Sequence, residues 1–204
     1  MDDIVKQAIA KWPNVPAVYG WLGLNRRGNW LIKGEQVSNP LIADFIGRNY
    51  EHDTEGRWYF QNGPQRVFVT LDYTPFVYRL AGDVAAQAPR GIEAHTGKPV
   101  ARVDSAWIDD AGAVLLVTDH GIGIIDDRDL ERLLPCLRGE GGAAVADDAI
   151  AATLERLQAG NDASLYFRYR ENAIPLKPIK ARRVALEFGF VTRPAQPAGE
   201  EECI

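Results

Sequence analysis

Apolar side chains recur along the chain at two spacings: every three to four residues, as in a helix with one buried face, and every second residue, as in a half-buried strand. The first helical pattern covers residues 2–12. Asp2 or Asp3 can cap this helix, and Pro13 ends it because proline cannot continue the helical hydrogen bonds. Its apolar positions share one face: Ile4, Val5, Ala8, Ile9 and Trp12.

A second helix is predicted over residues 40–50. Asn39 is the expected cap, and Pro40 takes the first helical position, where its missing N–H has no cost. Four apolar side chains lie on one face of this helix: Leu41, Ile42, Phe45 and Ile46. We therefore expect the helix to pack on a sheet.

Strand patterns fill the rest of the N-terminal third. Two short strands, residues 17–25 and 29–34, flank a turn, and residues 57–71 predict a hairpin that leads into a further strand. One buried face of the hairpin is expected to hold Trp58, Phe60, Val67 and Val69. Apolar side chains on both faces indicate that both are covered. A tight turn at Asn62–Gly63 would need an N–H that Pro64 lacks, so we expect a longer loop.

The C-terminal part follows a candidate linker at residues 82–91 that is rich in small residues. Its expected elements are strands at 99–109 and 113–119, a short helix through Leu130, Leu133, Leu134 and Leu137 with Pro135 as a kink, an alanine-rich helix to Leu157, and strands at 164–170 and 182–191. The pattern predicts an α+β fold with mainly antiparallel sheet. A small β-rich roll, residues 1–82, packs against an α+β subdomain, residues 91–192, and residues 193–204 form a disordered tail.

Composition narrows the class of protein. The 204 residues carry a net charge of −5, which disfavours nucleic acid as a partner. No apolar run approaches the roughly 18 residues of a membrane span, and the N-terminus lacks the apolar region of a signal peptide. The two cysteines, Cys136 and Cys203, are too few for a disulfide framework, and we expect both to be unpaired. These features predict a cytoplasmic protein with no membrane partner.

The segment "DHGIGIIDD", residues 119–127, is the strongest candidate for chemistry. It resembles the glycine box of ATPases of the histidine-kinase and gyrase type, in which an aspartate reads the adenine amino group and glycines let the backbone approach the nucleotide. That resemblance implies a nucleotide site at Asp119, Gly121 and Gly123. However, the family's magnesium-binding asparagine has no counterpart, since the chain has no asparagine between Asn62 and Asn161. We therefore favour a strand, a glycine turn and a helix capped by Asp126 or Asp127.

Other candidate chemistry is weaker. His52, His95 and His120 are isolated in sequence and lack the paired spacing of a zinc site, so no metal ligands are assigned. Cys136 lies among leucines and is expected to be a buried apolar side chain. The basic segment 168–183, with Tyr166, Phe167 and Tyr169 interleaved or adjacent, could stack single-stranded nucleic acid, but a solvated strand edge is the preferred interpretation.

The first third of the chain resembles uncharacterised bacterial (proteobacterial) families of unknown function. The shared features are a Gly-x-Trp strand at residues 28–30, a small helix at 41–45, Asp-x-x-Gly at 53–56 and an acid followed by x-Pro-Phe-Val at 72–77. The resemblance implies a β-rich roll joined to an α+β part, and it brings no catalytic residues.

Taken together, these observations predict a non-enzymatic module that binds a small molecule or a protein, with no cofactor and no catalytic residue assigned. The aromatic side chains of the N-terminal part are the reason for this interpretation. The alternative is a nucleotide-binding enzyme that uses Asp119, Gly121 and Gly123. The sequence assigns neither the partner nor an oligomeric state.

Overall fold

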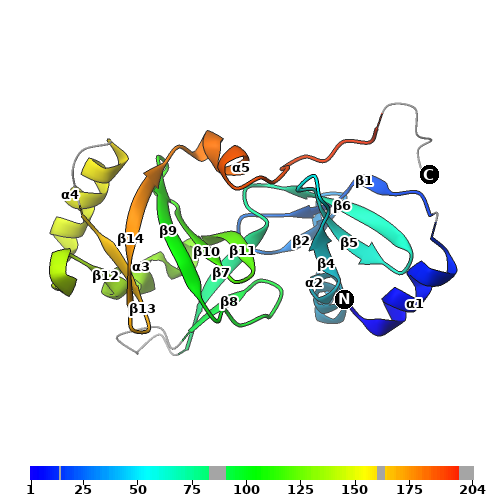
Figure 1. Ribbon diagram of the computed structural model, residues 1–204, viewed down its shortest axis with the longest axis horizontal. Helices are drawn as coiled ribbons and strands as arrows, with labels where there is room; N and C mark the ends of the chain where they lie inside the picture. The colour runs from blue at the N-terminus through cyan, green and yellow to red at the C-terminus, as the bar shows by residue number, and fades with distance from the viewer. Residues whose placement is uncertain (14, 83–90, 160–163, 198–204) are drawn as a thin grey trace. The chain divides into compact units, whose positions relative to one another are not determined.

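A computed structural model describes residues 1–13, 15–82, 91–159 and 164–197 (Figure 1). The described chain forms two compact units. The first comprises Met1–Pro75, His95–Gly97 and the described residues from Ala185 onward, and the second comprises Phe76–Ala94 and Lys98–Val184. In sequence, the second unit is therefore inserted into the first. The predicted linker lies largely outside the described residues, as do residues 198–204 of the predicted tail.

The first unit is built on a six-stranded sheet with the order β3-β2-β1-β6-β5-β4. Its strands are β1 (Val18–Leu24), β2 (Trp30–Ile32), β3 (Glu35–Gln36), β4 (Tyr50–His52), β5 (Trp58–Asn62) and β6 (Gln65–Leu71). Only β1 and β6 run parallel; the other neighbours are antiparallel. Two helices belong to this unit, α1 (Asp3–Lys11) and α2 (Pro40–Arg48).

The β5–β6 hairpin lies between the central strand β1 and the edge strand β4. Its turn consists of Gly63 and Pro64, and Asn62 pairs with Gln65 across it. Gly63 has the positive φ (56°) that the first position of a tight hairpin turn requires, and the fixed φ of proline is compatible with the second. The predicted longer loop is therefore wrong: Pro64 stands within the turn, where no N–H is needed.

The two helices begin differently. The predicted cap of α2 is confirmed, because the Asn39 side chain accepts a hydrogen bond of 2.9 Å from the Leu41 N–H. The predicted cap of α1 is wrong, since the Asp2 side chain makes no bond to its own helix. Its carboxylate instead accepts hydrogen bonds from Arg48 and Asn49, where α2 ends, because these cationic and amide donors lie within 3.3 Å.

An aromatic cluster covers part of one face of the first sheet. The Tyr50 ring lies 4.8 Å from that of Trp58 and 5.0 Å from that of Trp30, and the His95 ring lies 5.1 Å from that of Trp30. The Tyr50 hydroxyl donates to the carbonyl of Pro75, and burial raises the pKa of this phenol well above its usual value. The core of the first unit thus includes a ring that is distant in sequence, His95.

The second unit is built on an eight-stranded sheet with the order β12-β13-β14-β9-β10-β11-β7-β8. Its strands are β7 (Phe76–Ala81), β8 (Gly91–Ala94), β9 (Val103–Asp109), β10 (Val114–Thr118), β11 (Gly121–Ile125), β12 (Leu137–Arg138), β13 (Tyr166–Tyr169) and β14 (Asn172–Ile179). Two neighbouring pairs are parallel, β14 with β9 and β11 with β7. With two mixed sheets in which antiparallel pairs dominate, the predicted α+β class is confirmed.

Short helices connect these strands. They are the single turns η1 (Asp127–Asp129), η2 (Leu134–Cys136), η3 (Glu140–Gly142) and η4 (Ala181–Arg183), and the helices α3 (Leu130–Leu133), α4 (Asp147–Gln158) and α5 (Val184–Glu187). The predicted leucine helix is thus shorter than expected: α3 gives way to η2 at Pro135, and Leu137 belongs to β12.

Two predictions for the last part of the chain are wrong. Residues 182–187 belong to η4 and α5 rather than to a strand, Leu186 is exposed, and Val191 makes an isolated bridge with Arg57. The last strand of the chain is instead β14, which the sequence pattern does not predict because it contains Pro175 and Pro178. It is not a solvated edge, since it pairs with β13 on one side and β9 on the other.

Trp58→Ala is expected to lower the free energy of unfolding by about 3–5 kcal/mol, because it removes a buried ring that packs on Tyr50 and His52. The matched control is Trp12→Ala, whose half-exposed side chain should cost about 1 kcal/mol or less. Urea unfolding of the three proteins measures both values. Equal losses in the two variants would contradict the assignment of Trp58 to the core.

Acid is expected to weaken the fold through Asp126. Burial opposes ionisation of this carboxylate, but the hydrogen bonds from the Arg128 side chain and backbone outweigh it and hold the pKa of Asp126 below its usual value. A carboxylate with a lowered folded-state pKa stabilises the protein above its unfolded pKa of about 4, and this contribution is lost as the pH falls through the folded-state value. Asp126→Asn should flatten the fall in melting temperature below about pH 4, whereas Glu131→Gln, an exposed change on α3, should not. Identical pH profiles for Asp126→Asn and the unchanged protein would contradict this role.

Candidate functional site

Alternation along β5 and β6 sorts the side chains of the hairpin onto two faces, because consecutive residues of a strand point to opposite sides of the sheet. The register pairs Phe60 with Val67 and Asn62 with Gln65 on one face. The other face carries Tyr59, Gln61, Arg66 and Phe68. Trp58, Phe60 and Val69 are buried on the first face as predicted, while Val67 is only partly buried.

An irregularity in β1 adds side chains to the first face. Val18 pairs with Val67 and Leu22 with Val69, so β1 has two more residues than β6 between these pairs. Gly20 takes a positive φ of 72° within this bulge. A bulge changes the direction of the side chains that follow it, and here Trp21 joins Leu22 in lining the same space.

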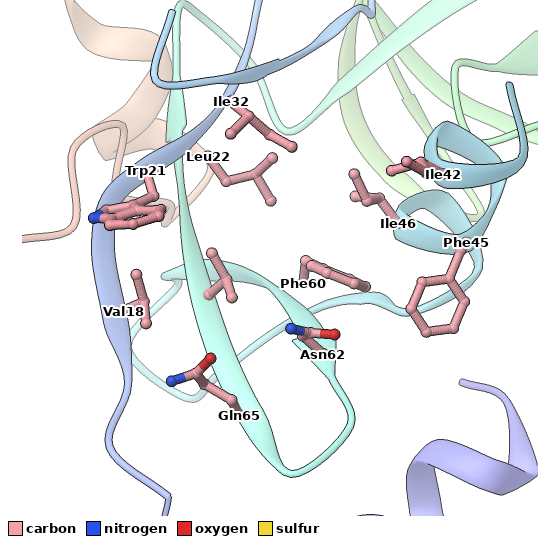
Figure 2. A pocket seen from close by; sticks show the side chains of 11 residues that line it. Val18, Trp21, Leu22, Ile32, Ile42, Phe45, Ile46, Phe60, Asn62 and Gln65 are labelled. Carbon is pink, nitrogen blue, oxygen red and sulfur yellow. The ribbon is translucent and has the colours of Figure 1, made fainter. Parts of the chain in front are cut away.

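Helix α2 supplies the opposite wall. Ile42, Phe45 and Ile46 point toward the space that Val18 and Leu22 line from β1 (Figure 2). The Phe45 and Phe60 rings meet edge to face, with 5.5 Å between their centres and 84° between their planes. Such a contact fixes the distance between helix and sheet at this point.

The walls enclose a pocket of about 500 Å³ in the first unit. Ile32 of β2 closes one side, and the hairpin ends it with the amides of Asn62 and Gln65 (Figure 2). Among the described residues that line the pocket, these two amides and the Trp21 indole N–H are the polar side-chain groups, and none of the lining side chains is titratable. The volume falls within the range of small-molecule sites, and the lining suits an apolar ligand with a polar end.

Large apolar side chains remain exposed at the rim of this pocket. Trp21 and Ile32 are each 44% exposed and Ile42 is 45% exposed. The Lys33 ammonium lies 3.7 Å from the centre of the Trp21 ring, a cation–π contact at the same edge. Exposed apolar side chains that gather around a cavity indicate a binding surface, whereas single ones are ordinary.

The glycine segment of residues 119–127 lies in the second unit, and it is not a loop. Thr118 pairs with Gly121 across a tight turn of Asp119 and His120, and Gly121–Ile125 form strand β11. The predicted glycine turn into a helix is therefore corrected: the glycines belong to the strand, and the helical turn starts only after Asp126. Asp126 caps that turn, accepting a hydrogen bond from the Arg128 N–H.

Gly123 accommodates an aromatic ring, that of Tyr78. A Cβ on Gly123 would lie 2.4 Å from the ring of Tyr78, so any side chain there would displace it. The Tyr78 hydroxyl donates to the Gly121 carbonyl at 2.9 Å and, having one hydrogen, accepts from the Thr118 hydroxyl at 2.7 Å. Burial raises the pKa of Tyr78 well above its usual value. Packing of this ring explains the residue type at position 123 without a ligand.

The carboxylate of Asp119 is held by backbone groups. One oxygen accepts hydrogen bonds of 3.1 Å from the N–H groups of Ala101 and Arg102. Burial opposes its ionisation, but these bonds and the neighbouring His120 hold the pKa of Asp119 below its usual value. Asp119, Gly121 and Gly123 thus lie close together, and their observed contacts are with the protein's own backbone and rings.

The remaining candidate residues lie apart from the pocket. Cys136 is a buried free cysteine, as predicted, and burial raises the pKa of its thiol; Cys203 lies outside the described residues. In the described part of the chain, no three side chains of His, Cys, Asp or Glu gather as metal ligands. Phe167 and Tyr169 of the basic segment are buried, so they are not available as stacking platforms.

The sequence pointed to the aromatic N-terminal part but missed the pocket itself. Trp21 and Gln65 lie 44 positions apart in the chain and meet only through the parallel pairing of β1 with β6. Gly20 was the available signal for the bulge, since an isolated glycine in a strand often marks one. No helix in the described ranges has the length and apolar character that a membrane crossing requires.

The chain belongs to the family DUF2944, described as "Protein of unknown function (DUF2946)", whose profile matches residues 1–195. The predicted resemblance to a family of unknown function is thereby confirmed, and the match is not restricted to the N-terminal third. None of the curated proteins matches the chain.

Two solved structures are similar. A DUF1285 family protein from Silicibacter pomeroyi DSS-3 has a TM-score of 0.53 and 17% identity, over 83% of this chain and 86% of that one. A DUF1285 family protein from Shewanella baltica OS155 has a TM-score of 0.42 and 14% identity, over 55% of this chain and 88% of that one. The first of these likenesses shows a shared fold.

Gly123→Ala is expected to destabilise the protein by about 1–3 kcal/mol or more, because the new methyl group would overlap the Tyr78 ring. Gly91→Ala in β8 is the matched control, since the nearest atom to its added Cβ is the Ala81 Cβ at 4.0 Å. Thermal unfolding compares them. A Gly123→Ala protein as stable as Gly91→Ala would show that packing does not require glycine at this position.

Proposed function

We propose that this DUF2944 protein is a binding module that holds the apolar part of a ligand in the pocket between α2 and the sheet of the first unit. The observation that carries the proposal is the pocket itself: a space of about 500 Å³ with apolar walls, surrounded by exposed Trp21, Ile32 and Ile42. A folded protein gains by burying such side chains, so their exposure around a cavity favours a site that a ligand covers.

The lining specifies the chemistry of the ligand. Aliphatic and aromatic walls favour an alkyl chain or a ring system, and each methylene that leaves water contributes about 0.8 kcal/mol. The Asn62 amide can donate and accept hydrogen bonds, and the Gln65 amide, which donates to the Pro16 carbonyl at 3.2 Å, adds a second polar group, so this end suits an uncharged polar group of a ligand. A fully buried charge would have no ionic partner in this lining and would be costly. An uncharged amphipathic small molecule is the best match.

Other interpretations have less support. An apolar side chain of a partner protein could occupy the same pocket. Binding of alcohols of increasing chain length distinguishes a small-molecule site from such a protein-binding site. The nucleotide-binding alternative at Asp119, Gly121 and Gly123 stays a prediction, and the contacts of these residues favour a structural role. A cytoplasmic location also stays a prediction from composition.

Straight-chain primary alcohols of increasing length test the proposal. Binding should strengthen about fourfold for each added methylene, the equivalent of about 0.8 kcal/mol, until the pocket is full, and then level off. Isothermal titration calorimetry measures the dissociation constants. Affinity that does not depend on chain length would contradict an apolar small-molecule pocket and leave the protein-partner interpretation.

Two variants of α2 locate the binding. Ile42→Glu places a charge on the pocket wall and should weaken alcohol binding at least tenfold, about 1.4 kcal/mol. Leu41→Glu is the matched control, because Leu41 is the adjacent residue of the same helical turn, is 76% exposed and does not line the pocket. Equal effects of the two substitutions would place the bound alcohol elsewhere.

A further inference from the structure

The opposite face of the same sheet carries a second cavity. A groove of about 960 Å³ lies over β1, β4, β5 and β6, on the side to which Tyr59, Gln61 and Phe68 point. Ile9, Pro13 and Pro197 contribute to its walls. Unlike the first pocket, it contains charged side chains, so it is suited to a different ligand.

Aromatic rings form the floor of the groove. The Tyr19 and Phe68 rings are stacked, with 4.6 Å between their centres, and the Tyr59 ring meets Phe68 edge to face at 5.8 Å. Two guanidinium groups lie over these rings: Arg66 over Tyr59 at 4.7 Å and Arg57 over Phe68 at 5.0 Å. Stacking on a ring restricts a guanidinium plane and leaves its N–H edge available for hydrogen bonds.

The two arginines differ in their acidic partners. Arg57 donates to the Asp53 carboxylate at 2.7 Å and lies 3.3 Å from the Glu55 carboxylate, so its charge is balanced. Arg66, in contrast, has no carboxylate within ion-pair distance among the described residues. Its guanidinium is therefore an exposed cation without a carboxylate partner in the described part of the chain, and it lies over the Tyr59 ring and lines the groove.

We propose that the groove binds an aromatic anion, a small molecule that carries an aryl ring and one carboxylate or phosphate group. The anionic group accepts two hydrogen bonds from the Arg66 guanidinium, whose fork matches the geometry of both groups. The aryl ring packs beside Tyr19 and the proline side chains of the wall.

The charges around the groove restrict the ligand to a small molecule with a single anionic group. Glu51 also lines the groove and lies 3.8 Å from the N-terminal ammonium, so this ion pair offers no net positive charge to a second anionic group. Burial raises the pKa of Tyr59. Arg66 lowers this pKa, whereas Glu51 and Asp53 raise it, so the phenol is neutral at pH 7. A polyanion such as nucleic acid is disfavoured by the same carboxylate and by the net charge of −5.

The test titrates the full chain with benzoate and with phenyl phosphate. Binding is measured by NMR chemical shifts or by calorimetry. Both should bind saturably, whereas benzamide, which has the ring without the charge, and inorganic phosphate, which has the charge without the ring, should bind at least tenfold more weakly. A preference for benzoate or for phenyl phosphate identifies the anionic group. Benzamide binding as tightly as benzoate would overturn the proposal, as would the lack of saturable binding by both anions.

Variants of arginine assign the site. Arg66→Gln should weaken benzoate binding about tenfold or more, and Arg66→Lys should restore only part of it, because an ammonium lacks the planar fork. Arg26→Gln is the matched control, since the Arg26 guanidinium also lies over a ring of the first unit, that of Tyr73, at 4.3 Å, but outside the groove. Equal benzoate affinity in Arg66→Gln and Arg26→Gln would overturn the assignment. Alcohol binding in the first pocket should be the same in all three variants, so the two proposals can fail separately.

Discussion

The first unit depends on a close contact between Gly56 and a segment more than a hundred residues later. A Cβ at Gly56 would stand 2.1 Å from the Gly189 carbonyl oxygen, and its φ of 75° is one that L side chains rarely adopt. Two backbone hydrogen bonds follow in the same segment. The Val191 N–H donates to the Gly56 carbonyl at 2.9 Å, and the Thr192 carbonyl accepts from the Leu71 N–H at 2.8 Å. These bonds fasten the C-terminal segment along the β5–β6 hairpin, which carries both cavities.

Alternation along that hairpin gives one sheet two surfaces of different chemistry. Phe60 and Val67 face α2 and line an apolar pocket, while Tyr59 and Arg66 face a groove of rings and charges. The tight turn at Gly63–Pro64 preserves the register that keeps the two sets apart, because a slip of one residue would exchange them. Both binding proposals therefore depend on the same strand pairing, although their ligands differ in charge.

Local patterns predicted the elements that obey local rules. The Asn39–Pro40 start of α2 and the alternation around Trp58 could be read from sequence because a cap and a strand each need only neighbouring residues. Strand β14 could not, since Pro175 and Pro178 argue against a central strand and its pairing with β9 joins segments far apart in the sequence. The pocket could not be predicted from the sequence either, because it requires the parallel pairing of β1 with β6 and the placement of α2.

The pocket follows from the way α2 packs. At its C-terminal end Ile46 and Gly47 are buried, and a Cβ on Gly47 would lie 3.2 Å from the Thr96 α-carbon, so glycine allows a close approach there. At its N-terminal end Leu41 and Ile42 remain exposed. The Phe45–Phe60 contact sets the distance between helix and sheet, and the space that remains is lined by Ile42, Phe45 and Ile46 on the helix side. The lining residues are mostly large apolar side chains, so the cavity comes from the placement of the helix over the sheet and not from small side chains in its walls.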